Sequence, residues 1–282
     1  MPKHIGVMVD GNRRWAKEQG FDRALGHAAG AKRIVDFLGW CTDLGIEHVT
    51  LYLLSTDNLK GRNQDELRDL VDIITSLSEH LATLGRWKLQ IVGDMDSLPT
   101  EAAERLVRVE EATSNNQGTH VNLAIAYGGR KEIADAMRRI LRKHASSGDS
   151  LEQLAEVLTP ELIAEHLYTG GQPDPDLLIR TSGEQRLSGF LLWQSANSEF
   201  YFAEALWPDF RRVDFLRAIR DFQRRHRRFG SQKTPKLTIF FWACLFAPTL
   251  NLRRRFSESA PQRSAGGNNS KPQAEDSKQK SA

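Results

Sequence analysis

Residues 4–12 read HIGVMVDGN, a short apolar run that ends in the Asp-Gly-Asn of positions 10–12. An apolar run of this length, bounded by turn residues, predicts a buried β-strand over His4–Val9. Apolar residues then recur at three- and four-residue spacing over Ala28–Leu44, which predicts a helix. A strand followed by a helix is the repeating unit of parallel sheets, whose ligands bind beyond the carboxyl ends of the strands. The polar residues at positions 10–12 therefore stand where a binding site is expected.

The same alternation of strand and helix patterns continues along the body of the chain. Strands are expected over His48–Leu54, Lys88–Val92, Val121–Ala126 and Leu177–Ile179, and helices over Asp65–Leu84, Thr100–Thr113, Arg130–His144 and Val213–Arg228, with a further helix starting at Thr159-Pro160. This order predicts an α/β fold with a mostly parallel central sheet flanked by helices on both faces. Long apolar helix faces are typical of core packing and, alternatively, of the wall of an apolar tunnel; one such face comprises Leu70, Ile73, Ile74, Leu77 and Leu81.

The charges are unevenly distributed along the 282 residues. Residues 231–282 contain nine of the 39 Lys and Arg residues and three of the 36 Asp and Glu residues, so they carry a net charge of +6 and leave −3 on residues 1–230. An acidic body does not favour nucleic-acid binding.

The two cysteines, Cys41 and Cys244, exclude a disulfide framework and a cysteine-ligated zinc site. The first residues contain no signal-peptide apolar segment, so a cytoplasmic location is expected.

The sequence divides into three parts. Residues 1–230 form the expected folded body. Residues 231–256 combine a polar linker with an apolar run, Leu237–Leu252, which is followed by three arginines. The sixteen residues of this run fall short of the roughly 20 that a membrane-spanning helix needs, so the segment is either a membrane-surface contact or an extension with incidental apolar content. Residues 257–282 are rich in Ser, Gln, Lys, Asn and Gly, which predicts a disordered tail.

Residues 10–15, DGNRRW, follow the first strand. An aspartate suits a hard cation, two guanidiniums suit phosphate oxygens, and glycine lets the backbone approach a ligand. The helix expected to start here also favours an anion. The motif therefore indicates a diphosphate with magnesium or, alternatively, a surface turn with solvated arginines. It is neither a Walker A loop nor a dinucleotide-binding G-x-G-x-x-G loop.

Two further polar clusters follow predicted strands. Residues 55–58, STDN, are typical of a helix cap, or of one site shared with positions 10–12. Residues 180–188, RTSGEQRLS, begin with an arginine at the end of a buried strand, where a charge needs an anionic partner. This second set of basic and hydroxyl side chains suits another phosphate group. Glu199 lies in an aromatic stretch and is either a site carboxylate or part of a core salt bridge. The histidines show no zinc-ligand spacing, and no G-x-S-x-G elbow is present.

Together these motifs resemble the cis-prenyltransferases, the Z-type isoprenyl diphosphate synthases that include undecaprenyl diphosphate synthase. The resemblance covers residues 4–230. It rests on Asp10-Gly11-Asn12 with Arg14-Trp15, Gly26-His27, Ser55-Thr56-Asp57-Asn58, Arg180-Thr181-Ser182-Gly183-Glu184 with Arg186 and Ser188, Leu191-Leu192-Trp193-Gln194, Glu199, Trp207-Pro208 and Arg228-Phe229-Gly230.

The resemblance implies a homodimeric fold with a hydrophobic tunnel, a Mg²⁺ cofactor and two substrates, an allylic diphosphate and isopentenyl diphosphate. It implies that Asp10 binds the magnesium and assists the departure of the allylic diphosphate, and that Glu199 also helps with the magnesium. The allylic diphosphate would be held by Gly11, Asn12, Arg13, Arg14, Arg23 and His27. Trp15, Ser55, Thr56, Asp57, Leu59 and Arg62 would help to place the substrates, and Arg180, Arg186, Leu187 and Ser188 would bind isopentenyl diphosphate.

Three further roles follow from the resemblance. Asn58 stands where the family's proposed proton acceptor stands, and because an amide has almost no basicity we expect it to position a water or phosphate that takes the proton. Arg228 and Gly230 look like the family's Arg-x-Gly ending, which reaches across the dimer toward the partner's active site. A lipid product also suits a peripheral contact of residues 231–256 with the inner face of the plasma membrane.

Departures from the family pattern bear on the product. Arg13 replaces a Gly that is common in long-chain members, Asp57 replaces Glu, Leu59 replaces Trp, and Gly61-Arg62 shifts the next arginine by one position. Leu53 occupies a tunnel-lining strand position where long-chain members usually carry Ala. Because a packed wall cannot be compressed, this bulk predicts a short product. The sequence looks most like the actinobacterial short-chain (2Z,6E)-farnesyl diphosphate synthases, with geranyl diphosphate as the expected primer.

The alternatives are distinct in chemistry. A long-chain polyprenyl diphosphate synthase would make undecaprenyl- or decaprenyl-type products. A non-catalytic prenyltransferase-like subunit would only stabilise a partner, and such subunits lack the aspartate motif that this chain retains at Asp10. A magnesium-dependent phosphatase or nucleotide-binding enzyme would release phosphate without forming a carbon–carbon bond.

Overall fold

The computed structural model describes residues 1–61, 63–148 and 150–225. The chain divides into a compact unit over Met1–Arg227 and a second unit over Arg228–Ala282, and the elements below all belong to the first unit. Several positions and segments singled out from the sequence lie outside the described residues, namely Arg62, Arg228, Gly230, 231–256 and 257–282.

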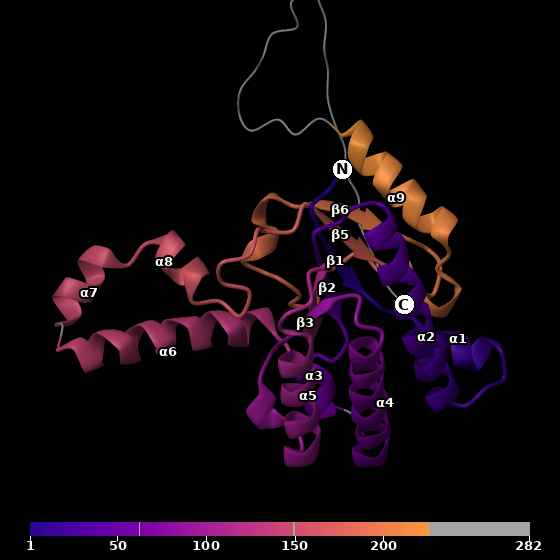
Figure 1. Ribbon diagram of the computed structural model, residues 1–282, viewed down its shortest axis with the longest axis horizontal. Coiled ribbons are helices and arrows are strands. Elements are labelled where there is room, and N and C mark those ends of the chain that lie inside the picture. The colour runs from indigo at the N-terminus through magenta and orange to yellow at the C-terminus, as the bar shows by residue number, and fades with distance from the viewer. Residues whose placement is uncertain (62, 149, 226–282) are drawn as a thin grey trace, which may run out of the picture. The chain divides into compact units, whose positions relative to one another are not determined.

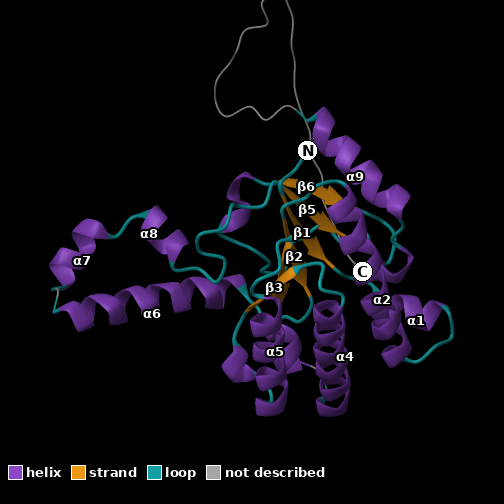
Figure 2. Ribbon diagram, viewed as in Figure 1, coloured by secondary structure: helices purple, strands orange, loops and turns teal. Residues whose placement is uncertain are grey.

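A sheet of six parallel strands forms the centre of the described part of the chain (Figures 1 and 2). Its strands are β1 (His4–Met8), β2 (His48–Tyr52), β3 (Lys88–Val92), β4 (His120–Ala124), β5 (Leu177–Arg180) and β6 (Glu199–Phe202). Their order is β3-β4-β2-β1-β5-β6, and each neighbouring pair is parallel. The α/β fold with a parallel central sheet is confirmed. β6 is an addition to the strands expected from the sequence.

Helices connect the strands and follow the last one. They are α1 (Asn12–Glu18), α2 (Arg23–Asp43), α3 (Thr56–Gly61), α4 (Gln64–Thr83), α5 (Thr100–Thr113), α6 (Gly129–Ser147), α7 (Leu151–Val157), α8 (Pro160–Glu165) and α9 (Arg212–Arg224), with 3-10 turns at Met95–Ser97, Gln194–Asn197 and Trp207–Asp209. α2 begins earlier than expected because the Asp22 side chain accepts a hydrogen bond from the Leu25 backbone N–H at 2.8 Å. Within the described residues, no helix has the length and apolar content needed to cross a membrane.

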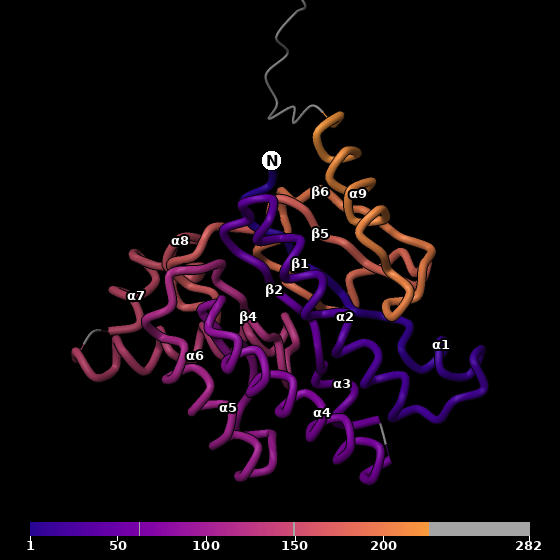
Figure 3. The backbone as a smooth tube through the Cα atoms, turned by 45° about the vertical axis from the view of Figure 1, so that its right-hand side comes forward, coloured from indigo at the N-terminus to yellow at the C-terminus, as the bar shows by residue number. Residues whose placement is uncertain are grey.

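One face of the sheet carries the main hydrophobic core. Ile5 and Val7 of β1 point to this face and are fully buried, as the two-residue period of a strand requires. Their cluster includes Phe37 of α2, Leu81 of α4 and Phe215 of α9. Burial of each such side chain contributes about 1.5–3 kcal/mol. α2 and α4 lie side by side on this face (Figure 3).

The opposite face has a smaller apolar cluster near the carboxyl ends of the strands. Met8, Leu178, Phe190 and Leu191 are buried there together with Tyr127. Part of the cover is irregular chain, which is tied to the start of α6 by a hydrogen bond from the Gly129 N–H to the Gly189 carbonyl at 2.8 Å. α6 itself extends away from the sheet, and α7 and α8 return alongside it (Figure 1).

The amino-terminal half of that face is polar. His4, His48 and His120 lie in register on β1, β2 and β4 and form a histidine row with ring centroids 5.7 and 5.5 Å apart. His4 Nδ1 donates to the Pro173 carbonyl at 2.6 Å, and its Nε2 lies 2.8 Å from Thr50 Oγ1. Burial lowers the pKa of His4 and of His120 to about 4. The row is therefore neutral near physiological pH.

The strand register decides which side chains meet. Met8 of β1 pairs with Tyr52 of β2 and with Arg180 of β5, so the residues that follow these three strands gather at one edge of the sheet. Glu199 begins β6 and pairs with Leu177. It therefore lies where the strands begin, away from the carboxyl ends at which Met8, Tyr52 and Arg180 lie.

Candidate active site

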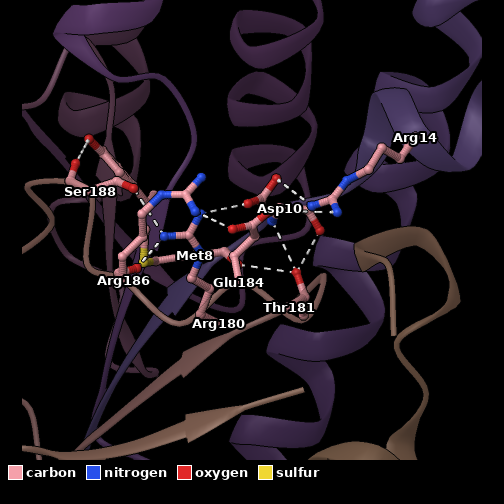
Figure 4. Close-up of polar contacts among 9 residues, drawn as sticks. Met8, Asp10, Arg14, Arg180, Thr181, Glu184, Arg186 and Ser188 are labelled. Carbon is pink, nitrogen blue, oxygen red and sulfur yellow. Dashed lines mark hydrogen bonds and ion pairs between the residues drawn. The ribbon is translucent and has the colours of Figure 1, made fainter. Parts of the chain in front are cut away.

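An ion pair joins the ends of β1 and β5 (Figure 4). Arg180 Nη2 lies 2.8 Å from Asp10 Oδ2; the arginine side chain is 6% exposed and the aspartate 37%. A buried guanidinium requires an anionic partner, which Asp10 supplies. Because the carboxylate remains partly open, it is available to a further ligand.

Thr181 fixes the backbone of Asp10. Its hydroxyl donates to the Asp10 carbonyl at 2.7 Å and accepts from the Asp10 N–H at 3.0 Å. Thr181, which follows β5, therefore holds the backbone of Asp10 in place. The chain then turns at Gly11, whose φ of +114° strains any other residue and whose added Cβ would lie 3.0 Å from the Leu206 Cα.

Arg180 also organises the loop that follows β5. Its Nη1 donates to Ser188 Oγ at 3.0 Å and to the Arg186 carbonyl. Arg186 forms an ion pair with Glu184, and Arg14 Nη1 of α1 lies 3.8 Å from the same carboxylate. Figure 4 shows Arg14 on one side of Asp10 and Arg180 with Arg186 on the other. The basic side chains predicted for two phosphate groups thus flank one aspartate.

Two buried polar atoms at this place have no hydrogen-bond partner within the described chain. They are Nε of Arg180 and Oδ1 of Asn12, and both residues line the same cavity. Leaving a buried polar atom unpaired costs about 1–3 kcal/mol. We therefore expect a polar ligand or water to complete the site.

The end of β2 adds hydroxyl, amide and carboxylate groups. Ser55 Oγ accepts from the Asn58 N–H at 3.0 Å, which caps the short helix α3, and Ser55, Asp57 and Asn58 all line the cavity. The cluster thus caps a helix, and it also shares a cavity with Asp10 and Asn12, while its contact with substrates stays a prediction. Tyr52 donates to the Ser188 carbonyl at 3.3 Å, and burial raises its pKa to about 12.

These groups open onto a cavity of about 750 Å³. The polar lining comprises Asp10, Asn12, Arg13, Arg14, His27, Tyr52, Ser55, Asp57, Asn58, Arg180, Glu184, Arg186 and Ser188, and the apolar lining includes Ala31, Ile34, Leu53, Leu70, Ile73, Ile74 and Leu77. Four of the five apolar α4 residues named from the sequence therefore line the cavity. Leu81 is fully buried in the core instead.

A second cavity of about 650 Å³ adjoins α2 and α4. Polar and charged residues of both helices line part of it, among them Lys32, Asp36, Asp72, Ser76 and His80. Ala31, Ile73 and Leu77 line both this cavity and the first one. These three side chains therefore form the partition between the two spaces.

A third cavity of about 980 Å³, called the basic cavity below, has charged lining residues of both signs, with one more Lys or Arg side chain than carboxylates. It shares Arg13, Arg14 and His27 with the first cavity and adds Lys17 and Arg23. Its acidic lining residues are Asp22, Glu66 and Asp69. Arg23, predicted for the allylic diphosphate, thus lies beside Arg13 and His27 but in this adjoining space.

The family model for prenyltransferases described as "Putative undecaprenyl diphosphate synthase" matches residues 8–230. The chain belongs to the undecaprenyl diphosphate synthase family. Isoprenyl transferase 1 of Streptomyces avermitilis is 55% identical over 231 residues, which is 82% of this chain and 90% of that protein. The (2Z,6E)-farnesyl diphosphate synthase of Mycolicibacterium smegmatis is 55% identical over 233 residues, 82% of this chain and 88% of that protein.

A solved structure of this prenyltransferase family has the same fold. Lavandulyl diphosphate synthase from Lavandula x intermedia, crystallised with dimethylallyl diphosphate, superposes with a TM-score of 0.75 at 34% sequence identity. The likeness covers 82% of this chain and 98% of that one. The chain is therefore an enzyme of the prenyltransferase class.

Not every residue predicted for this prenyltransferase site lines the cavities. Trp15 packs against Phe21, with ring centroids 5.8 Å apart. The Thr56 N–H donates to the Tyr127 carbonyl at 2.9 Å. Leu59 packs against the main core and Leu187 against the smaller cluster. These four residues border the site, and their contact with substrates stays a prediction.

Glu199 lies apart from Asp10 within one chain. It is in register with Leu177 and hence with Ile5, five residues before Asp10 along β1, which corresponds to about 16 Å along the strands. Its carboxylate pairs with Arg225 at 2.9 Å. Glu199 therefore forms a salt bridge, but a partly exposed one and not the core salt bridge considered from the sequence. A magnesium role for Glu199 stays a prediction.

Asp10 suits magnesium in a prenyltransferase of this kind. Magnesium commonly uses one or two carboxylates and completes its shell with water and substrate phosphates. Asp10 offers a partly open carboxylate between arginines that suit phosphate. In the described part of the chain, no cluster of three or more His, Cys, Asp or Glu side chains forms a complete metal cage. The residues therefore fit a metal held largely by bound diphosphate.

Sequence reasoning missed three residues that the structure places at the site. Tyr52 and Glu184 line the first cavity, and Glu66 lines the basic one. Glu184 stood inside a recognised motif, and Tyr52 precedes Leu53 on the same strand end, so position was the available signal for both. Nothing in the spacing of Glu66 indicated its contacts with α1 and α2.

Proposed function

We propose that this enzyme condenses isopentenyl diphosphate with an allylic diphosphate and forms a new double bond of cis geometry. The proposed primer is geranyl diphosphate, and the product is (2Z,6E)-farnesyl diphosphate. The observation that carries the proposal is that two basic clusters and an apolar wall line one cavity. Arg14 and Arg180 flank Asp10 at the polar end, and Leu53 and Ile74 belong to the apolar lining. Two diphosphate groups and one hydrocarbon chain suit this arrangement.

The reaction breaks the allylic carbon–oxygen bond, joins that carbon to the terminal methylene carbon of isopentenyl diphosphate, and releases diphosphate and a proton. Negative charge develops on the leaving diphosphate, where Arg13 and Arg14 would stabilise it. Positive charge develops on the allylic carbon, and the apolar lining would protect it from water. When bound at Asp10, magnesium would supply further neutralisation of the diphosphate charge.

Isopentenyl diphosphate would bind at the loop after β5. Arg180, Arg186 and Ser188 lie together there, and Arg180 Nε is a buried donor whose partner the ligand would supply. The same arginine holds Asp10 at 2.8 Å. We infer that the two substrates are thereby placed on either side of one carboxylate, at the separation that bond formation needs.

Asn58 would position the group that receives the proton. Its side chain has no useful basicity, whereas a water or a phosphate oxygen held by the amide does accept protons. The backbone N–H of Asn58 is fixed by Ser55, which supports a defined orientation of the residue. Asn58→Ala should lower kcat with both substrates saturating. Unchanged kcat would remove this role.

Leu53 would limit the product length. It lines the apolar part of the cavity directly after β2 and packs against the main core, so it has little freedom to move aside. The relative in M. smegmatis, named (2Z,6E)-farnesyl diphosphate synthase, supports a short product.

The decisive assay uses labelled isopentenyl diphosphate with dimethylallyl, geranyl and farnesyl primers, and resolves products by chain length and double-bond geometry. We expect a Z product of three isoprene units from geranyl diphosphate. A dominant product of five or more units would assign a long-chain synthase instead. Release of inorganic phosphate with no new carbon–carbon bond would assign a phosphatase.

Assembly and location extend the proposal. We propose a homodimer in which Arg228 and Gly230 reach the partner's site, and a peripheral contact of residues 231–256 with the inner face of the plasma membrane. The sheet register separates Glu199 from Asp10 in one chain, so a magnesium role for Glu199 would act at the site of a second copy.

Deletion of residues 231–282 should abolish liposome binding and leave turnover intact. Retained liposome binding would refute the membrane contact.

A further inference from the structure

One carboxylate in the basic cavity contacts two arginines from different helices. Glu66 Oε1 lies 3.1 Å from Arg13 Nη1 of α1, and Glu66 Oε2 lies 2.9 Å from Arg23 Nη1 of α2. The Glu66 side chain is 13% exposed, while those of Arg13 and Arg23 are 52% and 67% exposed. Glu66 stands in the first turn of α4. A single, largely buried carboxylate thus connects α1, α2 and α4.

The position of Glu66 on α4 connects it to the apolar cavity. Leu70, Ile73, Ile74 and Leu77 follow it at four, seven, eight and eleven residues, a spacing that places all five side chains on one helix face. The four apolar residues line the first cavity. Glu66 is therefore the polar end of the same face that forms the cavity wall.

The contacts leave both arginines available to a ligand. Each guanidinium has five N–H donors, and the contact with Glu66 uses one Nη of each. The carboxylate also offsets the repulsion between two cations that share one cavity with Arg14 and Lys17. The remaining donors of Arg13 and Arg23 are held in a fixed relation, which suits a ligand with several anionic oxygens.

We propose that Glu66 is a positioning residue for the allylic diphosphate. It holds Arg13 and Arg23 as one preformed binding unit and fixes the cavity wall of α4 relative to that unit. The proposal rests on the proposed function, which places the allylic diphosphate beside Arg13, and on the family resemblance, which adds Arg23. In the alternative role, Glu66 competes with the substrate diphosphate for the two guanidiniums, and the substrate must displace it.

The two roles predict opposite signs for the same substitution. Removal of the Glu66 charge would strengthen diphosphate binding if Glu66 competes, because an anion repels an anion. It would weaken binding if Glu66 positions the arginines, because two mobile guanidiniums lose more entropy on binding. For Glu66→Gln we expect KM for geranyl diphosphate to rise about tenfold, the fold-change of one hydrogen bond between charged groups, with KM for isopentenyl diphosphate unchanged.

Asp69→Asn is the matched control. Asp69 lies on the same helix and lines the same cavity, so the substitution removes the same charge at an exposed position. Its KM for geranyl diphosphate should fall or stay constant. Glu66→Asp retains the charge but shortens the reach, so it should raise KM as Glu66→Gln does. It also serves as the informative variant if Glu66→Gln does not fold.

Binding of inorganic pyrophosphate separates this inference from the function. Calorimetry on the full-length chain needs no turnover, so a wild type that makes no prenyl product still tests Glu66. We expect the Kd for pyrophosphate to rise about tenfold in Glu66→Gln, and to change less when Arg23→Gln is already present. A lower or unchanged Kd in Glu66→Gln would overturn the proposal. If the wild-type enzyme made no prenyl product, only the proposed prenyl-transfer function would be overturned.

Discussion

Arg180 Nη2 donates to Asp10 Oδ2 at 2.8 Å across the neighbouring strands β5 and β1. This contact joins the two basic clusters that the sequence suggested for separate phosphate groups. It also fixes the side chain that faces the cavity, because the arginine is buried and held by further bonds to the Arg186 carbonyl and Ser188 Oγ. The site is thus built from strand ends that the register brings together.

Asp10→Asn should reduce kcat by about 100-fold or more, the scale observed when one charge-stabilising group is removed from an active site. The fold should survive, because an amide oxygen also accepts from Arg180. Steady-state turnover and thermal unfolding would be measured on the same preparation. Asp43→Asn is the control, since Asp43 pairs with Arg212 on the exposed surface at 3.4 Å. Turnover within threefold of wild type would contradict a catalytic role for Asp10.

Leu53→Ala should lengthen the product from geranyl diphosphate by one or more isoprene units. The side chain lines the cavity directly after β2, so its removal adds space where the hydrocarbon is expected. Product chromatography provides the measurement. Leu67→Ala removes the same atoms from a partly buried α4 residue that packs against the core, and its products should match wild type. Identical product lengths in Leu53→Ala and wild type would show that another element sets the limit.

Ile73→Ala should also lengthen the products, by a different route. Ile73 lines both the 750 Å³ and the 650 Å³ cavity, so its truncation opens the partition between them. The stability cost should stay near the low end for such substitutions, about 2 kcal/mol, because Ile73 is only half-buried. Val35→Ala is the control, because Val35 lines the second cavity without forming the partition. If both variants made the wild-type product, the partition would have no part in length control.

The sequence allowed the sheet and its polar strand ends to be predicted, because apolar runs bounded by turn residues specify buried strands by themselves. The clusters beginning at Asp10, Ser55 and Arg180 followed from that pattern. β6 was not predicted, since its four residues read as an aromatic stretch and become a strand by pairing with β5. That pairing also decides where Glu199 lies.

The contacts of Glu66 depend on how three helices pack. No sequence period encodes a bridge between α1, α2 and α4, so the residue could not be identified before the structure. The start of α2 was misplaced for a more local reason. The Asp22 cap moves the helix start to Arg23, which brings that arginine to the basic cavity.

The histidine row should make the fold sensitive to acid. The pKa of His4 is about 4 in the folded chain, compared with about 6.5 in an unfolded one, so the unfolded state binds more protons between these values. The free energy of unfolding should therefore be constant above about pH 7.5 and decrease by about 2 kcal/mol by pH 5 for this residue. His4→Asn, which keeps a donor for the Pro173 carbonyl, should flatten the decrease, and His80→Asn on the exposed face of α4 should not. Urea unfolding at fixed protein concentration between pH 7.5 and 5 is the measurement, and parallel curves for wild type and His4→Asn would show that the buried imidazole does not control acid stability.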